Sequence, residues 1–148
     1  MVNFTMAEYD YAKSERQRYI VVDDDRMNNL VSKFVIQRHD NQAEIQLFTD
    51  PEIALANIFG INSTINDQQQ SIILLDINMP MMNGWDFLEQ VENQMQTKFN
   101  HFRIYMISSS IDLSDKKRAE DHRLLSGFFS KPLNDDHLKL ILSHGQRV

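Results

Sequence analysis

Polar side chains that can do chemistry stand directly behind short apolar segments of this 148-residue chain. They comprise carboxylates, hydroxyls and one ammonium group: Asp23, Asp24, Asp25, Asp76, Ser108, Ser109, Ser110 and Lys131. If the segments are neighbours in the fold, carboxylates about 4 Å apart repel by roughly 4 kcal/mol at an effective dielectric constant near 20. Such a cluster requires raised pKa values or a cation. Mg²⁺ fits, because one or two carboxylates typically hold it and leave its other positions to water and phosphate oxygens.

The segments in front of these side chains have the patterns of strands. We predict strands at residues 19–24, 44–49, 71–76, 102–108 and 127–130. The segment "SIILLD" (71–76) is typical of a fully buried strand that ends on a single carboxylate. The segment 44–49 alternates apolar and polar residues, which favours a less buried edge strand.

Each predicted strand is followed by a helical pattern. After the first strand, a spacing of i, i+3, i+4, i+7 and i+8 marks one face of a helix, formed by Met27, Leu30, Val31, Phe34 and Val35. The residues "TDP" (49–51) offer an N-cap and a first-turn proline for the second helix. Further helices are predicted at 85–95, 112–122 and 134–143. The helix at 112–122 has few apolar anchors beyond Ile111, Leu113 and Ala119, so we expect it to be loosely held.

Five strand–helix pairs indicate an α/β protein with a doubly wound parallel sheet and helices on both faces. In open sheets of this kind the binding crevice lies beyond the carboxyl ends of the strands, where the polar side chains stand. We expect residues 1–16 to be a flexible N-terminal extension and residues 17–148 to form one domain. The polar connection at 60–70 is also expected to be flexible.

Composition narrows the class of protein. Apolar residues make up 42% of the chain and charged residues 24%, which suits one compact domain. The chain has no cysteine, so no disulfide, thiolate metal site or cysteine nucleophile is expected. No apolar run reaches the roughly 20 residues of a membrane span, and the N-terminus lacks a signal-peptide pattern. A net charge of −6 disfavours binding to nucleic acid. We therefore expect a soluble, cytoplasmic protein.

Four motifs together resemble a known family. They are "VVDDD", "LLDINMPMMNG", "MISSS" and "FFSKPL", in this order along the chain. The chain is similar over about residues 18–144 to the receiver domain of two-component response regulators, and in particular to the single-domain chemotaxis regulator. The resemblance implies a flavodoxin-like (βα)5 fold with a five-stranded parallel sheet.

The resemblance also implies roles for the acidic residues. Asp76 would be the phosphoacceptor, a carboxylate that takes a phosphoryl group as an acyl phosphate. Asp23 and Asp24 would hold Mg²⁺, with Asp76 and the main-chain carbonyl of Asn78 as the further protein ligands. Asp25 would lie outside the metal's ligands, and taken alone it has the pattern of a helix N-cap.

The residues of the fourth and fifth strand ends receive roles in the same way. Ser108 would bond one phosphoryl oxygen and Lys131 would neutralise another. Pro132 matches a position that follows a cis peptide bond in the family. Phe128 occupies the aromatic switch position, where the family commonly has a tyrosine, so the hydroxyl is missing here. Gly84 would permit the tight loop that leads into the third helix.

The implied function is a stand-alone response regulator of a phosphorelay, because the sequence ends at Val148, just after the last predicted helix. A sensor histidine kinase or histidine phosphotransfer protein would donate the phosphoryl group in a Mg²⁺-dependent reaction. The phosphoryl group would change the surface of the fourth helix and fifth strand, through Ser108 and Phe128, and so control an unknown partner protein. Beyond its own phosphotransfer and dephosphorylation, we expect no enzyme activity.

Three alternatives use the same sheet. An aspartyl-phosphate phosphohydrolase also has an aspartate after a strand, but it usually has a second acid two residues later, where this chain has Asn78. A flavin carrier needs a phosphate-binding loop after the first strand, and none is present. A receiver-like docking module that never takes a phosphoryl group is disfavoured by the complete acidic set. The five histidines show no ligand spacing and are given no role.

Overall fold

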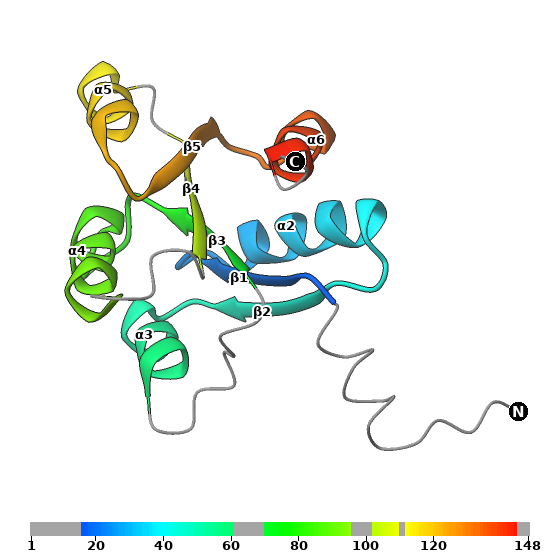
Figure 1. Ribbon diagram of the computed structural model, residues 1–148, viewed down its shortest axis with the longest axis horizontal. Coiled ribbons are helices and arrows are strands. Elements are labelled where there is room, and N and C mark those ends of the chain that lie inside the picture. Colours follow the sequence, from blue (N-terminus) through cyan, green and yellow to red (C-terminus); the bar gives the residue numbers. More distant parts are fainter. Residues whose placement is uncertain (1–15, 61–69, 96–101, 110–111, 145–148) are drawn as a thin grey trace, which may run out of the picture.

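The computed structural model describes residues 16–60, 70–95, 102–109 and 112–144. In these residues five parallel strands form one sheet in the order β2-β1-β3-β4-β5 (Figure 1). The α/β class, the parallel sheet and the number of strands are as predicted. The extension at 1–16 and the connection at 60–70 fall almost wholly outside the described residues, so the domain boundary at residue 17 stays a prediction.

The strands and helices alternate along the chain. Their bounds are β1 (Arg18–Val22), α2 (Arg26–His39), β2 (Glu44–Phe48), α3 (Pro51–Phe59), β3 (Ser71–Asp76), α4 (Gly84–Met95), β4 (Phe102–Ser108), α5 (Leu113–Asp121), β5 (Leu125–Ser130) and α6 (Asp135–His144). The predicted bounds of β3 and β4 are confirmed residue for residue. The first strand is shorter than predicted, because β1 ends at Val22 and leaves Asp23 and Asp24 beyond the sheet.

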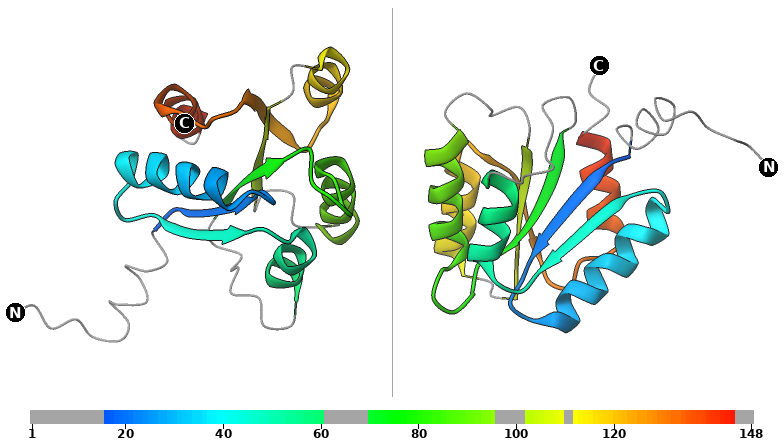
Figure 2. Two further views of the ribbon diagram at one scale, coloured as in Figure 1. Left: turned by 180° about the vertical axis from the view of Figure 1, so that it is seen from behind. Right: turned by 90° about the horizontal axis from the view of Figure 1, so that it is seen from below.

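Helices cover both faces of the sheet. Figure 2 shows α2 and α6 on one face and α3, α4 and α5 on the other. Alternate residues of the central strands supply the two cores: Ile20 and Ile73 pack under α3 and α4, whereas Tyr19 and Ile72 pack under α2 and α6. β3 is buried along its whole length, and β2, at the edge of the sheet, is half-buried throughout, as its alternating sequence predicted.

Aspartate side chains cap the N-termini of α2, α3 and α5. Asp25 accepts a hydrogen bond from the Met27 amide at 2.8 Å, so it is the N-cap of α2. Asp50 caps α3, and Pro51 follows it in the first turn, as predicted from "TDP". Asp112 caps α5 through the amide and hydroxyl of Ser114. Each cap ends the loop that follows the carboxyl end of a strand, so the caps set the direction in which the helix leaves the site.

Helix α2 turns most of its apolar stripe to solvent. Met27 and Phe34 are each 65% exposed, and Leu30 and Val31 are also exposed, while Val35 alone of the predicted stripe is buried. The buried face carries two polar and two apolar residues, Asn29, Ser32, Val35 and Ile36. The side-chain amide of Asn29 donates to the carbonyls of Asp23 at 3.0 Å and Phe48 at 3.3 Å. These bonds satisfy strand-end carbonyls that would otherwise be buried without a partner.

Of the described apolar residues expected to anchor the helix at 112–122, one is buried and one is exposed. Ala119 is buried, but Leu113 is 75% exposed, so the expectation that it anchors α5 is wrong. Leu113 follows the N-cap directly, and this position in the first turn points away from the sheet. Ile111, the third expected anchor, lies outside the described residues.

Candidate functional site

The candidate site lies where three strands end at the same edge of the sheet. Val22 pairs with Leu75, so the next residues of the two strands, Asp23 and Asp76, come out side by side. Lys131 directly follows β5, and its amide donates to the carbonyl of Ser108 at 2.8 Å. Asp23, Asp76 and Lys131 come from distant parts of the sequence, and they meet because each stands at the carboxyl end of its strand.

Lys131 joins the two buried carboxylates. Its Nζ lies 2.7 Å from Oδ2 of Asp23 and 3.0 Å from Oδ1 of Asp76. Asp23 and Asp76 are only 5% and 4% exposed, and a buried charge requires a partner of this kind. The other oxygen of Asp23 accepts the Asp25 amide at 2.9 Å, which fixes the carboxylate from the opposite side.

Burial changes the proton affinity of Asp76. Removal from water raises the pKa of this carboxyl group from 3.8 to about 6, and the negative charge of Asp23 adds to the rise. Lys131 and the Asn78 amide offset part of the effect by stabilising the ionised form. Burial alone would lower the pKa of Lys131, but its hydrogen bonds to Asp23 and Asp76 outweigh burial, and the pKa is raised. The ammonium group is therefore firmly charged at neutral pH.

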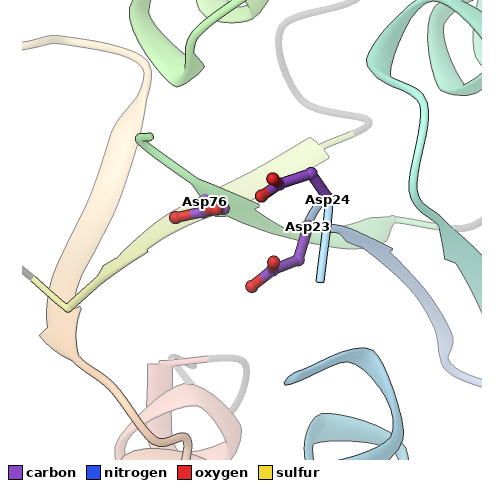
Figure 3. A group of neighbouring side chains, drawn as sticks. All are labelled: Asp23, Asp24 and Asp76. Atoms are coloured by element: carbon purple, nitrogen blue, oxygen red, sulfur yellow. The ribbon is translucent and has the colours of Figure 1, made fainter. Parts of the chain in front are cut away.

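Three carboxylates are close enough to hold one metal ion. Oxygen atoms of Asp23, Asp24 and Asp76 lie within 4.8 Å of one another, and Figure 3 shows the three side chains gathered beyond the ends of β1 and β3. Unlike its two buried neighbours, Asp24 is exposed and so reaches the site from the solvent side. An all-oxygen set with an open side suits a hard divalent cation such as Mg²⁺, which keeps several of its waters. The predicted metal residues are thus brought together.

The loop after β3 keeps Asp76 close to the start of α4. The Asn78 amide donates to Oδ1 of Asp76 at 3.3 Å, while the role expected for the Asn78 carbonyl stays a prediction. The Gly84 amide donates to the carbonyl of Ile77 at 2.7 Å. A β-carbon on Gly84 would lie 2.6 Å from the Asp76 carbonyl oxygen, so only glycine permits this close approach.

The residues expected at the switch lie on β4, which pairs with β3, and on β5, which pairs with β4 at the edge of the sheet. Ile107 of β4 pairs with Asp76, so Ser108 stands one residue further along that neighbouring strand and is 1% exposed. Phe128 of β5 is half-buried against the core on the side of α5. The peptide bond between Lys131 and Pro132 is cis, as the resemblance implied.

Sequence reasoning missed two sets of contacts around the site. Trp85 donates its indole N–H to Asp115 of α5 at 3.1 Å, a contact between helices that no pattern in either segment indicates. His39, which was given no role, has its Nε2 atom 2.8 Å from Oδ1 of Asp135 and so ties α2 to α6. Basic residues near the end of one helix and acidic residues at the start of another were the available signal for this second contact.

Residues 19–143 match the family described as the response regulator receiver domain. The chain belongs to this family. This match confirms the resemblance to receiver domains that four short motifs indicated. Receiver domains are phosphoacceptor signalling domains. Within the described part of this receiver domain, no helix combines the length and the apolarity needed to cross a bilayer.

Solved receiver structures share the fold. A two-component response regulator from Cytophaga hutchinsonii has a TM-score of 0.78 at 27% identity, with 87% of this chain and 96% of that chain covered. A response regulator receiver protein from Dyadobacter fermentans DSM 18053 has a TM-score of 0.74 at 24% identity, covering 86% and 96% of the two chains. Chemotaxis response regulator CheY4 of Vibrio cholerae has a TM-score of 0.66 at 25% identity, covering 87% and 98%. No curated protein sequence matches the chain.

Proposed function

We propose that this receiver domain accepts a phosphoryl group on Asp76 from a phosphohistidine donor, and that the phosphorylated form controls a partner protein. One observation carries the proposal: a lysine and two further carboxylates converge on Asp76 at the open edge of the sheet. A buried carboxylate with a cation and a metal-binding set beside it can be ionised for attack and can tolerate the charge that phosphorylation adds.

The contacts of Asp76 favour one oxygen as the nucleophile. Oδ1 accepts from both Lys131 and the Asn78 amide, whereas Oδ2 has no such contact with the described residues. Oδ2 attacks the phosphorus of the donor phosphohistidine in line, the new O–P bond forms, the N–P bond breaks, and the imidazole keeps the bond's electron pair. Lys131 then holds a phosphoryl oxygen, and the Ser108 hydroxyl donates to another.

The acidic residues supply the place for Mg²⁺. Asp23 and Asp24 would hold the ion together with Asp76, and the Asn78 carbonyl would be the remaining protein ligand. When bound, Mg²⁺ neutralises charge on the transferring phosphoryl group. Because Asp23 already binds Lys131 through Oδ2, the lysine and this carboxylate are held in position beside Asp76 before a donor arrives.

Helix α2 offers the phosphohistidine donor an exposed apolar surface beside the site. Met27 and Phe34 are strongly exposed on α2, and Asn28 and Val31 of the same helix line the pocket that contains Asp76. A sensor histidine kinase or histidine phosphotransfer protein that brings its phosphohistidine to Asp76 must cover this part of α2. An exposed apolar stripe of this spacing fits the apolar face of a helix.

The output surface lies on the other side of the site. Phosphoryl contacts with Ser108 and Lys131 change the ends of β4 and β5, next to α5 and Phe128. A downstream protein that recognises this surface would sense the phosphoryl group without touching it. The stand-alone form expected from the sequence stays a prediction.

Incubation with acetyl phosphate and Mg²⁺ tests the proposal, with intact mass as the measurement. We expect wild type to gain the mass of one phosphoryl group, and Asp76→Asn, or removal of Mg²⁺ with EDTA, to abolish the gain. Asp25→Asn is the matched control, because Asn also caps a helix, and it should be modified like wild type. A phosphorylated Asp76→Asn protein would refute the assignment, and an unmodified wild type would favour the docking-module alternative.

A further inference from the structure

Helix α5 is attached to the protein by very little apolar surface. Its sequence is LSDKKRAED, and Ala119 is the one buried residue among the nine, all of which the structure describes. Leu113 is 75% exposed. Since helices in proteins gain most of their stability from packing an apolar face, another contact must fix the position of α5.

Trp85, in the first turn of α4, contacts α5 along one face. Its indole Nε1–H donates to Oδ1 of Asp115 at 3.1 Å, and the guanidinium carbon of Arg118 lies 4.2 Å from the centre of the indole ring. The ring of His122, the C-cap, lies 6.4 Å away. These three partners are spaced i, i+3 and i+7, so they form one face of the helix. Trp85 itself is 8% exposed and belongs to the core under α3 and α4.

Trp85 is also held firmly on its own side. The preceding residue, Gly84, is bonded to the Ile77 carbonyl and lies against the Asp76 carbonyl without room for a β-carbon. The side chains of Asn83 and Asp86 each accept the other's amide, at 2.9 and 3.2 Å, which fixes the first turn of α4. The backbone that carries the indole is therefore held close to Asp76, whereas the partners of the indole belong to a weakly packed helix.

We propose that Trp85, Asp115 and Arg118 form a latch that holds α5 against α4 in the unphosphorylated protein and opens when Asp76 is phosphorylated. The closed latch follows from the contacts alone, and only its opening rests on the proposed function. We call these three residues the Trp85 latch.

The direction of the change follows from which side is fixed. Ser108, which would donate to the phosphoryl group, precedes Asp112, the N-cap of α5, by only a few residues. Movement of Ser108 toward Asp76 draws the first turn of α5 with it, and Asp115 lies in that turn. The indole cannot follow, because Trp85 is buried and its neighbour Gly84 is packed on the Asp76 backbone. The hydrogen bond between Trp85 and Asp115 is then lost.

The closed latch can be tested without phosphorylation. The chain contains a single tryptophan, so one indole N–H signal in a ¹⁵N NMR spectrum reports on it without ambiguity. Asp115→Ala should shift this signal and should speed amide hydrogen exchange in α5 by about tenfold, with exchange in α3 unchanged. Trp85→Phe keeps a ring in the core but removes the donor, and it should speed exchange in α5 in the same way.

Two controls separate the latch from general effects on the helix. Glu120→Ala removes another acidic side chain of α5, one that is exposed and does not belong to the face formed by Asp115, Arg118 and His122. It should leave the indole signal and the exchange rates as in wild type. Arg118→Ala removes the cation over the indole ring and should also speed exchange in α5. Lys117→Ala is its matched control, because it removes another cation from the same helix. Exchange in α5 that is equal in wild type and Asp115→Ala, or equally fast in Glu120→Ala and Asp115→Ala, would overturn the latch.

The opening is tested with beryllofluoride and Mg²⁺, a mimic of the phosphoryl group. In wild type the indole signal should move toward its position in Asp115→Ala, and exchange in α5 should rise several-fold. In Asp115→Ala the mimic should cause little further change. A wild type that binds the mimic, seen as shifts of the Asp23 and Asp76 amide signals, but keeps its indole signal would overturn the opening. Failure of the mimic to bind would count against the proposed function and would leave the closed latch standing on its own test.

Discussion

Nζ of Lys131 lies 3.0 Å from Oδ1 of Asp76, and both groups are largely shielded from water. The contact offsets part of the cost of burying Asp76 but not all of it, because Asp23 shares the same lysine. The pKa of Asp76 therefore stays raised, at about 6. In the metal-free protein the buried carboxylates of Asp23 and Asp76 repel each other, and a divalent cation would reduce this repulsion.

The first prediction concerns stability against pH. A carboxyl group whose pKa is higher in the folded state than in the unfolded state stabilises the fold below the unfolded pKa, and this is lost as pH rises through the folded pKa. For Asp76 these limits are 3.8 and about 6. As pH rises from about 4 to 7, the metal-free Asp76→Asn protein should thus become increasingly more stable than wild type. At pH 8 its unfolding free energy should exceed that of wild type by on the order of 1–3 kcal/mol.

Urea denaturation in EDTA at pH 4.5 and pH 8 measures this difference. Asp50→Asn is a suitable control, because Asp50 is an exposed N-cap of α3 and Asn can also cap. Its effect should be small and the same at both pH values. A difference between wild type and Asp76→Asn that does not change with pH would contradict the prediction. Added Mg²⁺ should narrow the gap at pH 8, because it stabilises wild type by binding.

The second prediction concerns Gly84. A β-carbon there would lie 2.6 Å from the Asp76 carbonyl oxygen and 2.9 Å from the α-carbon of Ile77, so Gly84→Ala must push the loop away from β3. We expect the unfolding free energy to fall by roughly 1–3 kcal/mol and phosphorylation by acetyl phosphate to slow. Met81→Ala in the same loop is the control: Met81 is 97% exposed, and its replacement should change stability by less than about 0.5 kcal/mol. Equal stability of the two variants would contradict the close approach.

The third prediction concerns the exposed stripe of α2. Replacing Met27 and Phe34 by serine should reduce phosphotransfer from a protein donor by about tenfold or more, because each removes a large apolar contact. Modification by acetyl phosphate should stay as in wild type, because the small donor does not need the helix. Ile53→Ser provides the matched control, since Ile53 is 54% exposed on α3, which covers the opposite face of the sheet. Loss of both reactions together, or an effect of Ile53→Ser on the protein donor, would argue against a donor surface on α2.

Much of the fold could be predicted because local pattern and tertiary structure agree. "SIILLD" and "FRIYMIS" are buried in the sheet over the predicted residues, and caps such as Asp50 and Asp112 use their own neighbours' amides. The convergence of Asp23, Asp76 and Lys131 also follows from the sequence, since parallel strands share one carboxyl edge. The four motifs indicate the family from the sequence alone.

The parts that could not be predicted depend on neighbours distant in the sequence. The apolar stripe of α2 is exposed because strand-end carbonyls require the amide of Asn29 on the buried side, and hydrophobic spacing carries no information about that need. The link between Trp85 and Asp115 requires the position of α4 relative to α5. The exposure of Leu113 also depends on how α5 lies against α4, where Asp115 and Arg118 contact Trp85.

Among the described residues, the one ammonium group in contact with both buried carboxylates comes from the residue after β5, the last strand of the sheet. A ribosome therefore synthesises Asp23 and Asp76 well before the lysine that balances them. Until β5 docks beside β4, a nascent chain would hold two adjacent negative charges without their counter-ion, and like charges in contact oppose compaction. Docking of the final strand removes this repulsion, so the acceptor site and the completed sheet should form in a single late step of folding.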